Sequence, residues 1–332
     1  MAQAIPTRPI AAVRTWRPMG SIALAATGIA VVLKVLDPTR LAAAQNFFLI
    51  LAALLIEAVP FVLLGAVVSA AIEVFVPQRA FDKIARLPAP LQLPTAGIAG
   101  MAFPVCECGS VPVARRLASK GLSPSAAVTF MLAAPILNPI VIAATVVAYR
   151  GRETLWPMVV GRAGLGLAAA MTVGWALGRR SPAELLRSRS ENHHDHHGPS
   201  RVAGFFSHLS SDFLFMGRYL VLGATVAAGM QTFVPQSLIG AVAGTPIVDL
   251  VAMMLLAFVL SLCSESDAFV AASFTQFGVG AQLAFLVFGP LIDIKLGFLY
   301  KGTFNRGFLW RVIALVGGVT LAGTLWIEVL IG

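Results

Sequence analysis

Long apolar segments separated by short polar ones fill the chain from residue 20 to its end. Each apolar segment is close to the roughly 20 residues that a helix needs to cross a bilayer. Because backbone polar groups must be satisfied inside lipid, such segments favour helices. The pattern therefore predicts an all-α, polytopic transmembrane helical bundle. Candidate spans cover residues 20–36, 46–75, 123–149, 155–177, 205–233, 281–300 and 309–331, and the span at 123–149 is interrupted by PILNP at residues 135–139.

Two further apolar segments are interrupted by polar residues. Residues 103–112 read FPVCECGSVP and residues 260–267 read LSLCSESD; we call them the first and second interrupted stretch. Pro104 and Pro112 bracket the first, so one regular helix is not expected there. Non-helical backbone at membrane depth is tolerated only where protein or a water-filled cavity satisfies it. We therefore predict a broken or re-entrant helix around each stretch, over residues 95–120 and 247–274.

The chain contains two copies of one unit. LLGAVVSAAIEVFVPQ at residues 63–78 and VLGATVAAGMQTFVPQ at residues 221–236 are identical at nine of sixteen positions. Apolar bias alone gives far fewer identities, which indicates an internal repeat. The same register, with one short gap, pairs Cys106 with Cys263 and residues 135–138 with residues 290–293.

The basic residues indicate an orientation, because cytoplasmic loops carry an excess of Lys and Arg. If each interrupted stretch returns to the side that it entered from, nearly all basic segments lie on one side. Each copy then has an odd number of crossings, so the copies are inverted, as in many secondary transporters. We expect a multi-pass protein of the inner (plasma) membrane. Its parts are a cytoplasmic N-terminus (1–19), an extra N-terminal helix and loop (20–45), membrane repeat 1 (46–177), a His-rich cytoplasmic linker (178–204) and membrane repeat 2 (205–332).

Composition excludes a soluble protein and narrows the partners. The chain is 58% hydrophobic and only 12% charged, with a formal net charge of +9. In a soluble protein that charge would suggest nucleic acid, but here the basic residues lie between apolar spans. The expected partners are the lipid bilayer and a small-molecule or metalloid substrate, with no nucleic acid. The sequence does not indicate an oligomeric state.

All three cysteines lie in the interrupted stretches. A helix that restarts near Ser110 would direct its positive end at the break. Cys106, Cys108 and Cys263 together would form a soft, three-coordinate site suited to trivalent arsenic or a thiophilic metal. The alternative is that they are small buried residues that allow close helix contact.

Glu107 and Glu265 carry carboxylates within these apolar surroundings, and neither has a basic neighbour in its own segment. Ionisable residues at membrane depth are costly and mark functional sites. Either residue could carry protons that are coupled to transport. Ser264 and Asp267 also fit a helix-capping box, so Asp267 is either a cap or a substrate ligand.

Asn138 and Asp293 occupy matching positions after a proline in the two repeats. They either supply oxygen ligands or repair a broken backbone by hydrogen bonding. Lys295 either pairs with Asp293 or belongs to the cytoplasmic end of its span. The candidate substrate-binding residues are thus Cys106, Glu107, Cys108, Gly109, Ser110, Asn138, Cys263, Ser264, Glu265, Asp267 and Asp293.

The linker contains HHDHH at residues 193–197. Its neighbours are typical of a solvated loop, which favours adventitious over dedicated metal binding. We expect no resident metal, no cofactor and no catalytic residues. No GxxxxGK[ST], HExxH or GxSxG motif is present in the sequence, so neither direct ATP hydrolysis nor a common hydrolase site is indicated.

Four segments in order also resemble a known family: PVCECGSVP (104–112), AAPILNP (133–139), CSESDAFVAASF (263–274) and GPLID (289–293). They are similar to signature segments of the bacterial predicted permeases that include the organoarsenical efflux permease ArsP. The resemblance extends over residues 46–300 and implies an inner-membrane permease. Some relatives export trivalent organoarsenicals.

The leading hypothesis is therefore a permease, a secondary transporter that moves a small solute, with efflux of a trivalent organoarsenical or another thiophilic species as its specific form. An intramembrane thiol redox enzyme using Cys106 and Cys108 is one alternative, and a channel for a small polar solute is another.

Overall fold

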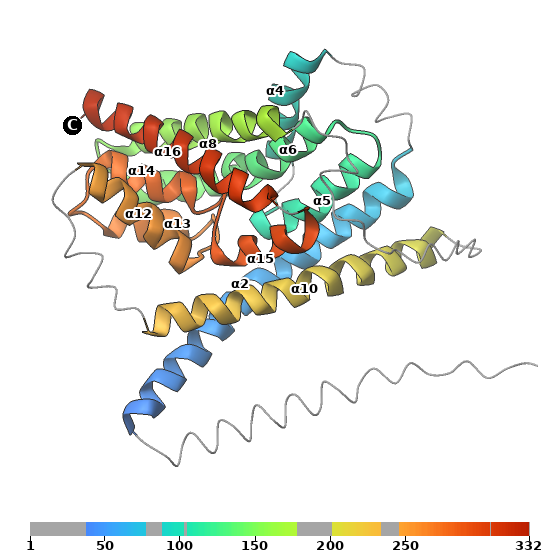
Figure 1. Ribbon diagram of the computed structural model, residues 1–332, viewed down its shortest axis with the longest axis horizontal. Helices are drawn as coiled ribbons and strands as arrows, with labels where there is room; N and C mark the ends of the chain where they lie inside the picture. Colours follow the sequence, from blue (N-terminus) through green and yellow to red (C-terminus); the bar gives the residue numbers. More distant parts are fainter. Residues whose placement is uncertain are drawn as a thin grey trace, which may run out of the picture. The chain divides into compact units, whose positions relative to one another are not determined.

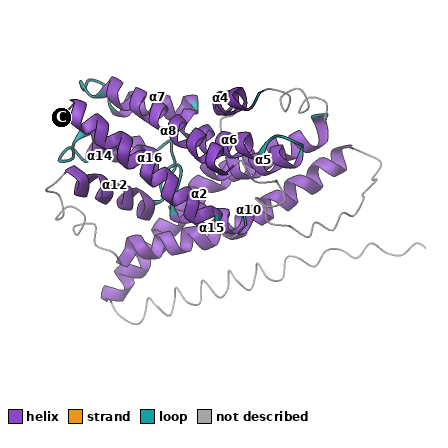
Figure 2. Ribbon diagram, turned by 45° about the horizontal axis from the view of Figure 1, so that its top comes forward, coloured by secondary structure: helices purple, strands orange, loops and turns teal. Residues whose placement is uncertain are grey.

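The computed structural model describes residues 38–77, 88–102, 105–177, 201–233, 246–305 and 307–331. Within these residues helices are the only elements (Figure 2). Five helical segments in this part of the chain are long and apolar enough to cross a membrane. The prediction of an all-α, polytopic membrane protein is confirmed. The expected span at residues 20–36 and the His-rich run lie outside the described residues.

Repeat 1 begins with α2, which starts at Pro38 and so extends further back than the expected residue 46. The expected span at residues 155–177 coincides with α8. The contacts discussed below lie within the compact unit from Leu49 to Gly332. The helices are α2 (Pro38–Phe75), α4 (Ala89–Ala99), η1 (Gly100–Ala102), α5 (Glu107–Ser119), α6 (Pro124–Leu137), α7 (Pro139–Ala148) and α8 (Leu155–Leu177).

Repeat 2 differs from the prediction at one place, because the single span expected at residues 281–300 is two helices. Pro290 has no N–H to continue a helix. Asp293 then caps the next helix, its Oδ1 accepting a hydrogen bond from Leu296 N at 2.6 Å. The helices are α10 (Arg201–Phe233), α12 (Pro246–Leu260), α13 (Asp267–Ser273), α14 (Val279–Phe288), α15 (Ile294–Thr303) and α16 (Phe308–Ile331).

The two repeats pack their helices in the same way. In repeat 1, α6 contacts α4 and α8; in repeat 2, α14 contacts α12 and α16 (Figure 1). Across the repeats, α5 contacts α15 and α13 contacts α7. Because α5 of repeat 1 corresponds to α13 of repeat 2, and α7 to α15, these two contacts are equivalent. This packing agrees with the internal repeat read from the sequence. The inverted orientation of the copies in the membrane stays a prediction.

The duplicated segments of α2 and α10 each use a glycine to approach the centre of the bundle. A Cβ on Gly65 would lie 2.5 Å from the Gly109 Cα in α5, and one on Gly223 would lie 2.7 Å from the Lys295 Cα in α15. Gly223 minus Gly65 gives the repeat offset of 158. Small residues at such contacts let helix backbones pack closely in membranes. The repeated sequence therefore places a glycine where α2 packs against α5 and another where α10 packs against α15.

A polar network joins α2, α5 and α10 at one end of the bundle. Asp212 Oδ2 accepts a hydrogen bond from Ser69 Oγ at 2.8 Å and from Arg116 NH2 at 3.1 Å. Arg116 NH1 also lies 3.3 Å from Glu73 Oε2. Because one guanidinium contacts carboxylates of two other helices, the network fixes α5 between α2 and α10.

The repeats are joined again at the loop between α7 and α8. Tyr149 donates a hydrogen bond to Gln282 Oε1 at 2.8 Å, and Arg152 donates one to the Ala272 carbonyl at 2.9 Å. Burial raises the pKa of the Tyr149 hydroxyl well above its usual value. The hydroxyl therefore keeps its proton and remains a donor to repeat 2.

Candidate substrate site between the interrupted stretches

The first interrupted stretch turns into a helix earlier than expected. Cys106 is the extended residue that precedes α5, and the helix begins at Glu107 rather than near Ser110. Pro112 lies inside α5 instead of bounding it. A proline this close to the start of a helix removes only the hydrogen bond to the Cys108 carbonyl. The break therefore lies on the N-terminal side of Glu107.

Gly109 and Ser110 hold the first turn of α5 in place. Ser110 Oγ donates to the Met131 carbonyl of α6 at 2.9 Å. Gly109 faces α2, where a Cβ would lie 2.9 Å from the Phe61 carbonyl oxygen. A larger residue would push the helices apart, because that contact involves backbone rather than a flexible side chain. Both predicted site residues thus position the neighbouring thiols and carboxylate.

The second interrupted stretch separates α12 from α13, as predicted. Ser261, which directly follows the last residue of α12, adopts a left-handed conformation with φ of 47°. Ser261 Oγ accepts a hydrogen bond from Ile294 N at 3.1 Å, and Gln231 Nε2 donates to the Leu260 carbonyl at 2.9 Å. Side chains therefore satisfy the Leu260 carbonyl at the end of α12 and the Ile294 amide at the start of α15, as membrane depth requires.

The two stretches meet through one hydrogen bond. Ser264 Oγ of repeat 2 donates to Glu107 Oε2 of repeat 1 at 3.1 Å. Ser264 is fully buried and Glu107 is 2% exposed. A hydroxyl and a carboxylate from opposite repeats thus share one buried polar site.

The three cysteines are free and buried. Cys106 and Cys108 flank Glu107 in the sequence, and Cys263 directly precedes Ser264, whose hydroxyl is hydrogen-bonded to Glu107. Among the described residues no group of three or more His, Cys, Asp or Glu side chains is close enough to hold a metal ion. The thiols are thus neighbours without a preassembled three-coordinate metal centre.

Lys295 supplies a positive charge that the sequence did not connect with Glu107. Its Nζ lies 3.9 Å from Glu107 Oε1 and 3.7 Å from Asp293 Oδ2. The three side chains are at most 2% exposed, and none of these three atoms has a hydrogen-bond partner. We call these three residues the Lys295 cluster. Unsatisfied buried polar groups are costly, so a ligand or water that bonds to them gains free energy.

Asn138 and Asp293 each use one atom to repair the backbone. Asn138 Oδ1 accepts from Ile140 N at 2.9 Å at the start of α7, and Asp293 caps α15 in the same manner. Asn138 Nδ2 and Asp293 Oδ2 have no hydrogen-bond partner, although both are buried. Each residue therefore caps a helix and also presents an unpaired polar atom.

Arg162 is a central residue that the sequence pattern did not single out. It is fully buried in α8, and its NH2 donates to Asp267 Oδ2 at 2.7 Å and to the Ser264 carbonyl at 3.0 Å. Its NH1 donates to Thr145 Oγ1 at 2.9 Å. One signal was available, because Arg162 is the only charged residue among positions 155–177. Charges at membrane depth mark functional sites.

The capping box expected from Ser264 and Asp267 does not form. Ser266 precedes α13 and makes no side-chain capping bond. The Ser264 hydroxyl is instead used by Glu107, and the Asp267 carboxylate is used by Arg162. Contacts with the other repeat have replaced the local cap.

Glu265 and Glu57 place two further carboxylates near the second interrupted stretch. Both Glu265 carboxylate oxygens are buried without a hydrogen-bond partner. Glu57 Oε1 of α2 accepts from Ser266 Oγ at 3.0 Å. Several carboxylates thus lie around the second stretch, and among the described residues Arg162 and Lys295 are the buried cations beside them.

Fold and site together define a helical membrane protein with a buried polar site between two repeated halves. That class is typical of permeases. The family model described as "Predicted permease" (ArsP_1) matches residues 43–329, so the chain belongs to this predicted permease family. The expectation of a transport protein rather than an enzyme is confirmed.

Two relatives support this assignment. UPF0718 protein YcgR of Bacillus subtilis is 40% identical over 294 residues, covering 86% of this chain and 99% of the relative. A Streptococcus mutans protein named "Putative two-component membrane permease complex subunit" is 35% identical over 266 residues, covering 78% of this chain and 87% of the relative. No solved structure matches the chain.

Proposed function

We propose that this permease is a secondary transporter that exports a small thiophilic or organometalloid solute, such as a trivalent organoarsenical, across the inner membrane. The observation that carries the proposal is the Ser264–Glu107 hydrogen bond at 3.1 Å. It brings the interrupted helices of both repeats together beside three free thiols. Repeats that meet at broken helices near mid-membrane form the substrate sites of many secondary transporters.

The thiols of Cys106, Cys108 and Cys263 are the soft ligands for the cargo in this proposal. Sulfur ligands prefer soft, polarisable centres over hard cations. Because the described residues contain no ready-made metal centre, binding would draw the thiols together around the cargo. That movement would transmit binding from one repeat to the other, since Cys263 belongs to repeat 2.

Glu107 or Glu265 couples this movement to protons. Both carboxylates are buried in an apolar bundle, and each has at least one oxygen without a hydrogen-bond partner. Buried acids at membrane depth commonly relay protons in transporters. The Lys295 cluster lies beside the same thiols and supplies polar contacts for the cargo.

The test uses inverted membrane vesicles from cells that lack the protein and are complemented with each variant. Uptake of phenylarsenous acid is measured with and without a proton gradient. Wild type should concentrate the arsenical only when the gradient is present. Cys106→Ser should lower uptake at least about tenfold, corresponding to about 1.4 kcal/mol of lost interaction. Ser210→Ala, which removes an exposed hydroxyl on α10, is the matched control and should transport normally.

The outcomes separate the alternatives. Cys106→Ser vesicles that accumulate the arsenical as wild type does would contradict the role of the thiols. Equilibration without accumulation, whatever the gradient, would instead indicate a channel.

A further inference from the structure

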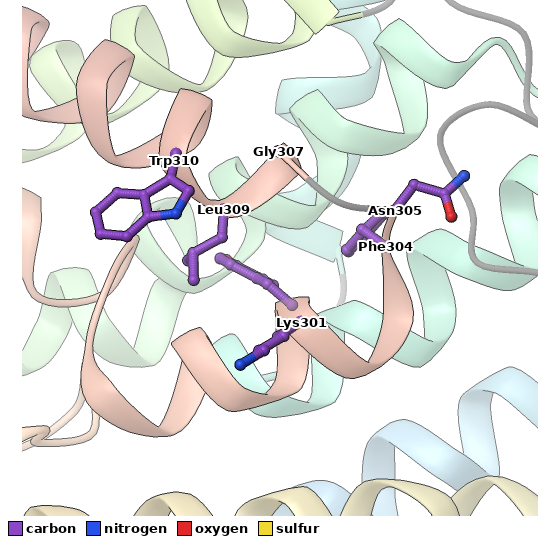
Figure 3. Close-up of a pocket in the computed structure, with 7 residues that line it drawn as sticks. Lys301, Phe304, Asn305, Gly307, Leu309 and Trp310 are labelled. Atoms are coloured by element: carbon purple, nitrogen blue, oxygen red, sulfur yellow. The ribbon is translucent and has the colours of Figure 1, made fainter.

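A second hollow lies at the corner between α15 and α16, apart from the buried site. Its volume is about 940 Å³, which is within the range of small-molecule pockets. Figure 3 shows its lining, which comes from the end of α15, the turn that follows and the first turn of α16. The lining residues are Tyr300, Lys301, Phe304, Asn305, Gly307, Leu309 and Trp310.

The outer part of this cavity is open, and its edge carries both polar and apolar side chains. Lys301 is exposed, Trp310 is 73% exposed and Asn305 is half-buried. Gly307 has φ of 89°, a left-handed conformation that favours glycine, and a Cβ there would meet nothing within 4 Å.

One residue of the inner wall, Tyr300, is hydrogen-bonded to the turn that leads to the Lys295 cluster. Tyr300 is 2% exposed, and its hydroxyl donates to the Leu291 carbonyl at 3.2 Å. Leu291 lies in the turn that leads to Asp293, a member of the Lys295 cluster. Lys295 itself precedes Tyr300 by five positions on α15, about 7.5 Å along the helix axis. Tyr300 therefore separates the open cavity from the buried cluster.

Tyr300 belongs to a cluster of three aromatic rings. Phe304 stacks on Phe308 with ring centroids 4.0 Å apart, and Tyr300 lies 6.0 Å from Phe304 and 5.7 Å from Phe308. Both phenylalanines are 4% exposed. Only dispersion and apolar burial hold the two phenylalanine rings, so they can move without breaking hydrogen bonds.

We propose that this cavity is the vestibule through which cargo enters, and that Tyr300, Phe304 and Phe308 form the closed gate between it and the Lys295 cluster. The cargo that suits it is a small solute with an apolar body for the rings and a hydrogen-bond acceptor for Lys301 or Asn305. The inference rests on the proposed function because it gives the loading route of that same site.

The chain carries its own reporters of gate opening, because its only three cysteines lie in the buried site. The purified full-length protein in lipid nanodiscs is treated with a charged, membrane-impermeant maleimide, and each labelled cysteine is identified by mass spectrometry. Wild type should react slowly. Phe304→Ala should raise the labelling rate of Cys108 and Cys263 at least about tenfold, which equals a loss of about 1.4 kcal/mol from the closed state.

Three variants make the result specific. Phe285→Ala removes an equally buried ring in α14, away from the cavity, and should leave labelling slow. Phe304→Leu is a milder opening variant in case truncation impairs folding, and it should give an intermediate rate. Leu309→Trp fills the cavity and should slow the labelling that Phe304→Ala permits.

Unchanged labelling in both Phe304 variants, or equal acceleration by Phe285→Ala, would overturn the vestibule. The readout involves no cargo, so it separates this inference from the proposed function. Accelerated labelling of Phe304→Ala, together with a wild type that fails to transport phenylarsenous acid, would support the vestibule and contradict the proposed cargo. Arsenical transport by wild type, together with unchanged labelling of Phe304→Ala, would support the proposed cargo and contradict the vestibule.

Discussion

Two buried cations cross between the repeats in opposite directions and are held very differently. Arg162 extends from repeat 1 to Asp267 of repeat 2, with a hydrogen bond of 2.7 Å and further bonds to Ser264 and Thr145. Lys295 extends from repeat 2 toward Glu107 of repeat 1, at 3.9 Å and without a hydrogen bond.

This difference in bonding suits Arg162 and Lys295 to different roles. A guanidinium that forms several short bonds in a rigid fork is suited to fix one geometry. An ammonium on a flexible stem, at a distance from both carboxylates, leaves polar atoms that a ligand can satisfy. We therefore propose that Arg162 maintains the second interrupted stretch, whereas the Lys295 cluster contributes to binding and release of cargo or protons.

The largest expected loss of stability is for substitution of Arg162. Arg162→Ala leaves Asp267 buried without its partner, and breaking a buried ion pair in this way costs about 3–5 kcal/mol. The thermal unfolding midpoint in detergent should fall sharply and transport should be lost. The double variant with Asp267→Ala should recover part of the stability, because no uncompensated carboxylate remains. If Arg162→Ala unfolds at the wild-type temperature, the pair does not support the architecture.

A smaller effect is expected where α10 supports Lys295. Gly223→Ala places a Cβ 2.7 Å from the Lys295 Cα, so α10 and α15 must shift apart. Overpacking of this kind costs about 1–3 kcal/mol. The unfolding midpoint should fall moderately, and transport should fall with it as the cluster moves. Gly217→Ala is the matched control on the same helix, since nothing lies within 4 Å of its Cβ position. Equal behaviour of the two variants would mean that this contact does not position Lys295.

The breaks and the repeat could be predicted from sequence because their signals are local. Prolines, thiols and acids inside apolar runs mark the interrupted stretches, and the Asn138 break lies directly before Pro139. The register of the internal repeat also pairs Cys106 with Cys263 from the sequence alone. Pro290 carried the same kind of signal for the break between α14 and α15, but the apolar residues around it favour one continuous span.

The contacts between repeats could not be predicted in this way. Glu107 and Ser264 are 157 positions apart, and Arg162 and Asp267 are 105 apart. No periodicity within one helix indicates which distant residue will face it. The capping-box pattern at Ser264 and Asp267 was wrong for the same reason, because cations and carboxylates from the other repeat offered stronger partners.

The most direct test of the account compares transport with stability in one variant. Lys295→Met keeps a long apolar side chain in α15 and removes only the charge. In proteoliposomes, its uptake of phenylarsenous acid should fall at least about tenfold, while its unfolding midpoint should shift less than that of Arg162→Ala. Transport at the wild-type rate by a folded Lys295→Met protein would contradict the proposal that the Lys295 cluster supplies polar contacts for the cargo.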